Sequence, residues 1–151
     1  MKIIHPPKLS AELESIPLDS EAARRYAKYY EGGVQAGFPS PADDFKDTPL
    51  SLDERYLSNP NQTFLIRVVG DSMYPTLMLG DILIVKSDRE IEDGEIGIIS
   101  VNHTDFTVKR LSKKESRLVA DNPAHDNISL GDDDTVVCLG VVRHLVRDVD
   151  K

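Results

Sequence analysis

Short apolar runs separated by turn residues fill the carboxy-terminal two thirds of the chain. They cover residues 63–69, 82–86, 95–101, 104–110, 116–120 and 135–147. Runs of this length, rich in Val, Ile and Thr and bounded by Gly, Asn or Asp, predict β-strands. Asn102-His103 lies between two of the runs closely enough to close a hairpin. The pattern therefore predicts a mainly β domain.

The amino-terminal third has a different pattern. Three prolines within residues 1–17 favour an extended arm. Ser20 is a suitable N-cap for a short helix over Glu21–Tyr30, which would end at Gly32-Gly33. The three tyrosines of this helix could form a contact face, either for the chain's own domain or for a partner. The amino-terminal segment is thus expected to be an extended and short-helical arm.

A second helix signal follows at Ser51-Leu52-Asp53-Glu54, which has the pattern of a capping box. Asn59-Pro60 limits this helix to one or two turns, because the residue before proline disfavours helical backbone. We expect the β domain to begin with this helix.

Composition and charge limit the classes of function. The chain has 151 residues, 40% of them hydrophobic, which suits one globular domain. Its net charge of -8 argues against a surface that binds nucleic acid directly, so any role in DNA metabolism should run through protein partners. Residues 1–36 carry five basic and five acidic side chains, and all of the excess acid lies in residues 37–151, which supports a boundary near residue 36.

Cysteine and hydropathy indicate the compartment. A single cysteine, Cys138, cannot form an internal disulfide, and the amino terminus has no apolar run long enough for a signal peptide or a membrane anchor. We therefore expect a cytoplasmic protein with no membrane contact. No histidine or cysteine cluster has metal-ligand spacing and no glycine-rich phosphate loop occurs, so we expect neither a metal nor a cofactor.

The candidate nucleophile is Ser72, in the segment Gly70-Asp71-Ser72-Met73-Tyr74-Pro75-Thr76-Leu77 between two predicted strands. A glycine before the serine and a proline after it restrict the backbone and place the hydroxyl in a tight turn. The four histidines follow no triad pattern, so the candidate base is Lys109. Alternation places Thr107, Lys109 and Leu111 on one face of a strand.

Burial of that face would make Lys109 a usable base. A free lysine, with a pKa near 10.4, is almost fully protonated at neutral pH, and desolvation can lower this pKa by several units. Taken singly, each residue also has an ordinary interpretation, because Gly-Asp-Ser turns are common and strand lysines usually extend to water.

A resemblance favours the catalytic interpretation. The motifs Gly-Asp-Ser-Met-x-Pro-Thr-Leu, Gly-Asp-x-Leu-x-Val and Thr-Val-Lys-Arg-Leu resemble those of the LexA and UmuD family of self-cleaving Ser/Lys peptidases, over residues 36–147. The resemblance implies a β-rich domain of the LexA/UmuD carboxy-terminal type. It also implies that Ser72 is the nucleophile, that Lys109 is the general base, and that the backbone amides of Ser72 and Met73 form the oxyanion hole.

The self-cleavage site implied by the resemblance is the Ala36-Gly37 bond. The segment around it contains one glycine and two prolines, which favour an extended and accessible chain, and its small side chains leave little steric bulk near the bond. This divides the chain into a removable regulatory arm (1–36), a linker (37–50) and a peptidase and dimerisation domain (51–151). The arm is longer than the UmuD pattern would predict.

The resemblance further implies a role in the SOS response. A RecA filament on single-stranded DNA would stimulate cleavage, and the trimmed homodimer would join a UmuC-type Y-family polymerase in translesion synthesis. Two alternatives remain open. One is a non-catalytic polymerase-binding module with a vestigial dyad. The other is a relative of type I signal peptidases, which share the serine and lysine motifs but carry a membrane anchor.

Overall fold

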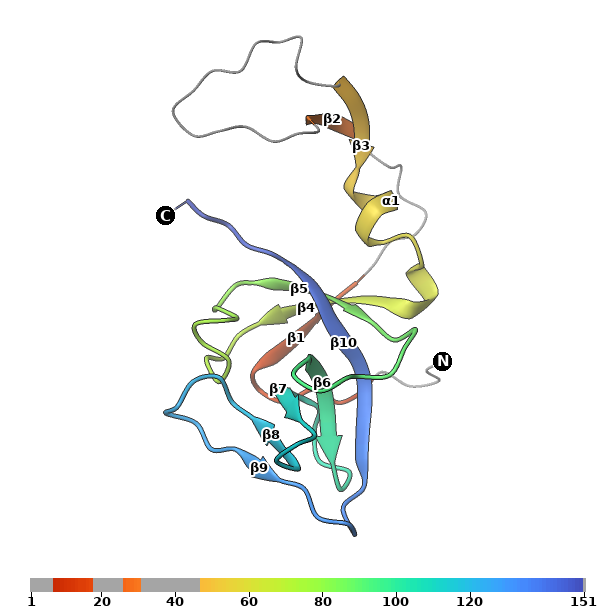
Figure 1. The fold of residues 1–151 in the computed structure, drawn as a ribbon. Coiled ribbons are helices and arrows are strands. Elements are labelled where there is room, and N and C mark those ends of the chain that lie inside the picture. Colours follow the sequence, from red (N-terminus) through yellow and green to blue (C-terminus); the bar gives the residue numbers. More distant parts are fainter. Residues whose placement is uncertain (1–6, 18–25, 31–46, 151) are drawn as a thin grey trace. The chain divides into compact units, whose positions relative to one another are not determined.

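A computed structural model describes residues 7–17, 26–30 and 47–150, which form two compact units (Figure 1). The larger unit is an eight-stranded sheet with the strand order β1-β4-β5-β10-β6-β7-β8-β9, in which all neighbours run antiparallel. Its strands are β1 (Leu13–Ile16), β4 (Thr63–Val68), β5 (Ile82–Lys86), β6 (Ile96–Val101), β7 (Thr107–Ser112), β8 (Arg117–Val119), β9 (Ile128–Ser129) and β10 (Val136–Val146). The predicted mainly β fold class is confirmed.

In the smaller unit, residues 19–58, the structure differs from the predicted helix. Tyr26–Tyr30 form a strand, β2, which pairs antiparallel with β3 (Asp47–Ser51), so the helix predicted over Glu21–Tyr30 is wrong for residues 26–30. The rest of that helix lies outside the described residues. A three-turn helix is marginal in isolation, whereas aromatic residues suit a strand with a partner, so the pairing overrides the local preference.

The capping box at Ser51 is confirmed. Helix α1 (Leu52–Tyr56) begins immediately after Ser51, whose Oγ accepts a hydrogen bond from the Glu54 amide at 3.3 Å. A short 3-10 helix, η2 (Pro60–Gln62), follows and leads into β4 of the larger unit.

The six apolar runs correspond to β4, β5, β6, β7, β8 and β10. The hairpin at Asn102-His103 is also confirmed: both residues have left-handed backbone, with φ of 51° and 62°, and join the antiparallel pair β6 and β7. Two strands of the larger unit lay outside the predicted runs. β9 has only two residues, and β1 belongs to the predicted extended arm, where Leu13 is buried in the core opposite Val68.

Two apolar clusters fill the larger unit. The larger cluster joins Leu13 to residues of β4, β5, β6, β7 and β10 and to the turn that contains Ser72. The smaller cluster contains Ile99, Leu111 and Leu118. Strand β7 contributes Val108 to one cluster and Leu111 to the other. Both faces of this strand are therefore covered, although the alternation pattern leads us to expect one.

Asp81 and Arg147 form an ion pair in this unit, in which the carboxylate is buried and the Arg147 side chain is 32% exposed. The Asp81 side chain is 1% exposed and accepts from Arg147 Nη2 at 2.6 Å, from Arg147 Nε at 2.7 Å and from the Met78 amide at 2.8 Å. Burial tends to raise the pKa of this carboxyl, but the Arg147 and Met78 hydrogen bonds outweigh it, and the pKa is lowered from 3.8.

Arg147→Met should therefore lower the free energy of unfolding at pH 7 by clearly more than the loss of a surface ion pair does, because it leaves a buried carboxylate without its cation. A depressed folded-state pKa stabilises above the unfolded-state value, so this loss should shrink as the pH falls below about 4. Denaturant unfolding of both proteins at pH 7 and below about pH 4 measures this loss of unfolding free energy. Arg117→Met, which removes an exposed pair with Glu115, should cost under about 0.5 kcal/mol. Equal losses at both pH values would contradict the assignment to Asp81.

Candidate active site

Ser72 lies in the connection between β4 and β5, and its side chain is buried at 2% exposure. The residues on its carboxy-terminal side anchor this turn: Met73 and Leu77 are fully buried in the larger cluster. Backbone hydrogen bonds from Tyr74 to Asp71 and from Leu77 to Met73 close the turn, at 3.1 and 2.9 Å. The predicted tight turn is present, and the Ser72 hydroxyl points into the protein.

Lys109 on β7 reaches Ser72 across the sheet. Its Nζ lies 3.2 Å from Ser72 Oγ, 3.2 Å from Thr107 Oγ1 and 3.1 Å from the Val108 carbonyl oxygen. Lys109 is 7% exposed, so it does not extend to water as strand lysines usually do. The structure thus brings together the two residues that the sequence analysis paired.

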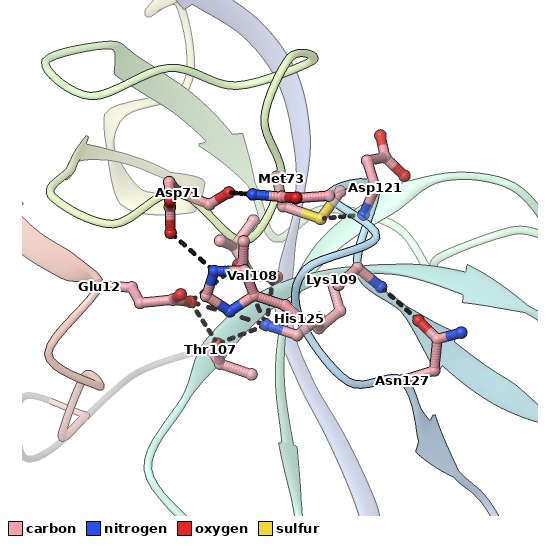
Figure 2. A network of polar contacts seen from close by, with 12 residues as sticks. Glu12, Asp71, Met73, Thr107, Val108, Lys109, Asp121, His125 and Asn127 are labelled. Atoms are coloured by element: carbon pink, nitrogen blue, oxygen red, sulfur yellow. Dashed lines mark hydrogen bonds and ion pairs between the residues drawn. The ribbon is translucent and has the colours of Figure 1, made fainter.

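Glu12 is a third member of the site, and the sequence analysis missed it. It immediately precedes β1, and its Oε2 accepts from Ser72 Oγ at 2.9 Å and from Thr107 Oγ1 at 3.2 Å (Figure 2). The same oxygen lies 3.6 Å from Lys109 Nζ. Glu12 and Ser72 are 60 residues apart, and no local pattern in the arm distinguishes Glu12 from Glu14.

The loop between β8 and β9 holds the Ser72 turn from the other side. The Asn122 amide donates to the Ser72 carbonyl at 3.0 Å, and Asn122 Nδ2 donates to the Asp71 carbonyl at 2.9 Å. The Asp121 amide donates to Met73 Sδ at 3.5 Å, and this contact is one of those drawn in Figure 2. These contacts fix the backbone on both sides of the Ser72 side chain.

An ion pair and a hydrogen bond fix this loop in turn. Arg110 makes two hydrogen bonds to Asp121, at 2.9 and 2.6 Å, and these bonds hold the pKa of Asp121 below its usual value. His125 Nε2 lies 2.7 Å from Asp71 Oδ1. The Asp121 and Asp71 pairs were not predicted, because Arg110 and His125 carry no local signal of their partners.

The remaining site predictions have different outcomes. In the described part of the chain, the amides of Ser72 and Met73 donate to no backbone or side-chain acceptor, which leaves both free for a ligand oxygen. Their role as an oxyanion hole stays a prediction. Ala36 and Gly37 lie outside the described residues.

The described ranges contain neither a cluster of metal-binding side chains nor a helix that could span a membrane. Residues 7–17, 26–30 and 47–150 contain no group of three or more His, Cys, Asp or Glu residues arranged to hold a metal ion. None of the helices found in these ranges is long and apolar enough to cross a membrane.

Comparison with known proteins decides the family. The Peptidase S24-like family model matches residues 28–143. The chain belongs to this family. Protein ImpA of Salmonella typhimurium is 34% identical over an alignment of 139 residues that covers 87% of this chain and 91% of ImpA. Protein MucA of the same species is 37% identical over 84 residues, 55% of this chain and 57% of MucA.

The LexA repressor of Acidithiobacillus ferrooxidans is also similar, with 36% identity over 122 residues, 77% of this chain and 58% of the repressor. The resemblance to LexA and UmuD that the motifs around Ser72 and Lys109 indicated is confirmed. The family match covers both of these residues.

Proposed function

We propose that the protein is a self-cleaving serine peptidase that cuts its own Ala36-Gly37 bond with Ser72 and Lys109. The observation that carries this proposal is the 3.2 Å contact between Lys109 Nζ and Ser72 Oγ, with both side chains buried, in a chain of the S24-like family. A hydroxyl nucleophile within hydrogen-bond reach of an amine is the geometry that nucleophilic catalysis needs.

In the proposed reaction, Lys109 in its neutral form takes the proton of the Ser72 hydroxyl. Ser72 Oγ then attacks the carbonyl carbon of Ala36, and the carbonyl oxygen becomes an oxyanion. The amides of Ser72 and Met73 donate hydrogen bonds to it, and one such donor contributes about 3 kcal/mol to the transition state in other enzymes. The protonated Lys109 gives its proton to the Gly37 nitrogen as the peptide bond breaks. Water then hydrolyses the ester between Ala36 and Ser72.

The tethered substrate makes regulation necessary. A scissile bond on the same chain has a very high effective concentration, so restraint has to come from keeping the bond away or from keeping the base protonated. Ala36 and Gly37 suit such a substrate, because their small side chains allow the backbone to approach Ser72 closely.

We further propose that cleavage belongs to the SOS response. By family resemblance, a RecA filament on single-stranded DNA stimulates it in the cytoplasm. The trimmed homodimer then serves a UmuC-type Y-family polymerase in translesion synthesis. The net charge of -8 supports a role through these protein partners rather than through direct DNA contact.

Intact mass measurement tests the cleavage. The purified protein is incubated between about pH 7 and about pH 10.5, where lysine loses its proton. We expect a 115-residue product (151 minus 36) that begins at Gly37 and forms faster as the pH rises. RecA, single-stranded DNA and a nucleotide should accelerate its formation at pH 7. If no product forms under any of these conditions, the alternative of a non-catalytic binding module with an idle dyad replaces the proposal.

A further inference from the structure

The Glu12 carboxylate occupies the space directly beside the Ser72 hydroxyl. Its Oε2 is 2.9 Å from Ser72 Oγ, and an attacked carbonyl carbon has to approach the same oxygen to about 3–3.5 Å. A carboxylate at this position also repels the oxyanion that the reaction forms. Figure 2 shows Glu12, which lies immediately before β1, reaching toward Thr107 and Lys109.

The hydrogen bonds around Lys109 fit a resting site. Nζ lies within hydrogen-bond distance of three oxygens, on Ser72, Thr107 and Val108, which matches the three N–H donors of a charged ammonium. The Ser72 hydroxyl donates to Glu12. A general base needs the opposite arrangement, with the Ser72 proton directed at an amine lone pair. Glu12 therefore competes with Lys109 for the proton and supplies a negative charge 3.6 Å from Nζ.

We propose that residues 8–16 form an internal latch, in which Glu12 holds the Ser72 and Lys109 pair inactive until this segment leaves the sheet. This inference rests on the proposed self-cleavage and names how that site is regulated. The latch belongs to the arm of residues 1–36, so a cut at Ala36-Gly37 also breaks its covalent link to the dyad.

The structure holds the latch by specific contacts. β1 pairs with β4 from Leu13 opposite Val68 to Ile16 opposite Leu65, and the Val69 amide donates to the Glu12 carbonyl at 2.7 Å. Before β1, the Ser10 amide donates to the Phe106 carbonyl at 2.8 Å, and the Phe106 amide donates to the Lys8 carbonyl at 3.0 Å.

Gly70 makes room for the Glu12 side chain. A Cβ added at Gly70 would lie 2.6 Å from Glu12 Cγ, closer than real Cβ contacts come, so any larger residue would displace Glu12. The glycine of the Gly-Asp-Ser motif therefore has a second role in this chain: it allows Glu12 to lie against the nucleophile turn.

Strand β1, the part of the latch that pairs with the sheet, can separate from the sheet without disrupting other strands. β1 has four residues and lies at an edge of the sheet, bonded on one side to β4. Among the residues of β1, Leu13 alone is buried, while Glu14 and Ser15 are exposed. A short edge strand loses few contacts when another extended segment replaces it. An activator that binds the arm has to break this pairing, the Leu13 contacts and the backbone hydrogen bonds of residues 8–12 to Phe106 and Val69.

Glu12→Gln tests the latch with the full chain. The amide keeps the size of the side chain and removes the charge, so we expect product formation at pH 7.5 to become about 10-fold to 100-fold faster. Glu14→Gln is the matched control: it makes the same change two residues away on the exposed face, and its rate should equal that of the wild type. A fluorophosphonate probe, followed by intact mass, reports the reactivity of Ser72 independently of the cleavage site, with Ser72→Ala as the blank.

Each outcome separates the latch from the proposed cleavage. Faster product and faster labelling in Glu12→Gln support both. Faster labelling without a product that begins at Gly37 supports the latch and overturns the cleavage site. If the wild type cleaves and Glu12→Gln cleaves at the same rate or more slowly, the latch alone is overturned. A slower rate would also place Glu12 in the catalytic machinery. Neither product nor labelling in any variant overturns both.

Discussion

Ser72→Ala is expected to lower the rate of Ala36-Gly37 cleavage by at least about 10⁴-fold. The reaction we propose forms an ester on Ser72 Oγ, and alanine offers no atom in its place. Lys109 would also have no hydroxyl to deprotonate, and its remaining charged neighbour would be Glu12. The measurement is the fraction of 115-residue product after the time in which the wild type cleaves completely at high pH.

Ser100→Ala is the matched control for this variant. Ser100 is 3% exposed, close to the 2% of Ser72, and its Oγ donates to the Thr104 carbonyl at 2.6 Å, away from the dyad. It loses a buried hydroxyl and a hydrogen bond, so its stability should fall while its cleavage rate stays close to that of the wild type. A Ser72→Ala protein that is processed as fast as the Ser100→Ala protein would remove Ser72 from the mechanism.

The features predicted correctly from the sequence are those that depend on neighbouring residues. The turn at Ser72 follows from a glycine and a proline within a few positions, and the capping box at Ser51 depends on four consecutive residues. The strand at Lys109 follows from a short apolar run. Pairing Ser72 with Lys109, 37 residues apart, required the family resemblance, because no local rule joins two separate strands.

The features that sequence reasoning missed depend on distant partners. Glu12 contacts a residue 60 positions away, and Asn122 supports Ser72 across 50 positions (122 minus 72). β2 is a strand because β3 pairs with it, which the composition of the tyrosine-rich segment does not show. Each of these features is determined by tertiary pairing with a distant partner, and a short window of sequence does not contain that partner.

Strand β7 shows that alternation of residues along a strand does not predict how many of its faces are buried. Its alternation predicted one buried face, yet Val108 at 2% and Lys109 at 7% exposure are buried on opposite faces. The amino-terminal segment accounts for part of this difference, because a bridge between Leu9 and Phe106 places it beside the start of β7. The segment predicted to be an extended arm thus helps to bury the lysine, and it brings Glu12 to the same place.

Lys109→Met is expected to slow cleavage by about 10²-fold to 10⁴-fold and to flatten its dependence on pH. Methionine keeps most of the aliphatic side chain and removes the amine. The wild-type rate should rise with pH because an ammonium has to lose its proton before it can accept one from Ser72. The residual rate of the variant would then come from solvent base and from the positioning of Ser72 alone. Product mass, measured at several pH values from about 7 to about 10.5, gives both profiles.

Lys86→Met is the control that separates catalysis from burial. Lys86 is a second partly buried lysine in the sheet, with its Nζ 2.8 Å from Thr63 Oγ1 and its pKa lowered by desolvation. Its removal should change thermal stability as Lys109→Met does, while the pH profile of cleavage should follow that of the wild type. If Lys109→Met instead kept the wild-type profile, the general base would be another group. The Glu12 carboxylate, 2.9 Å from Ser72 Oγ, would then be the first candidate.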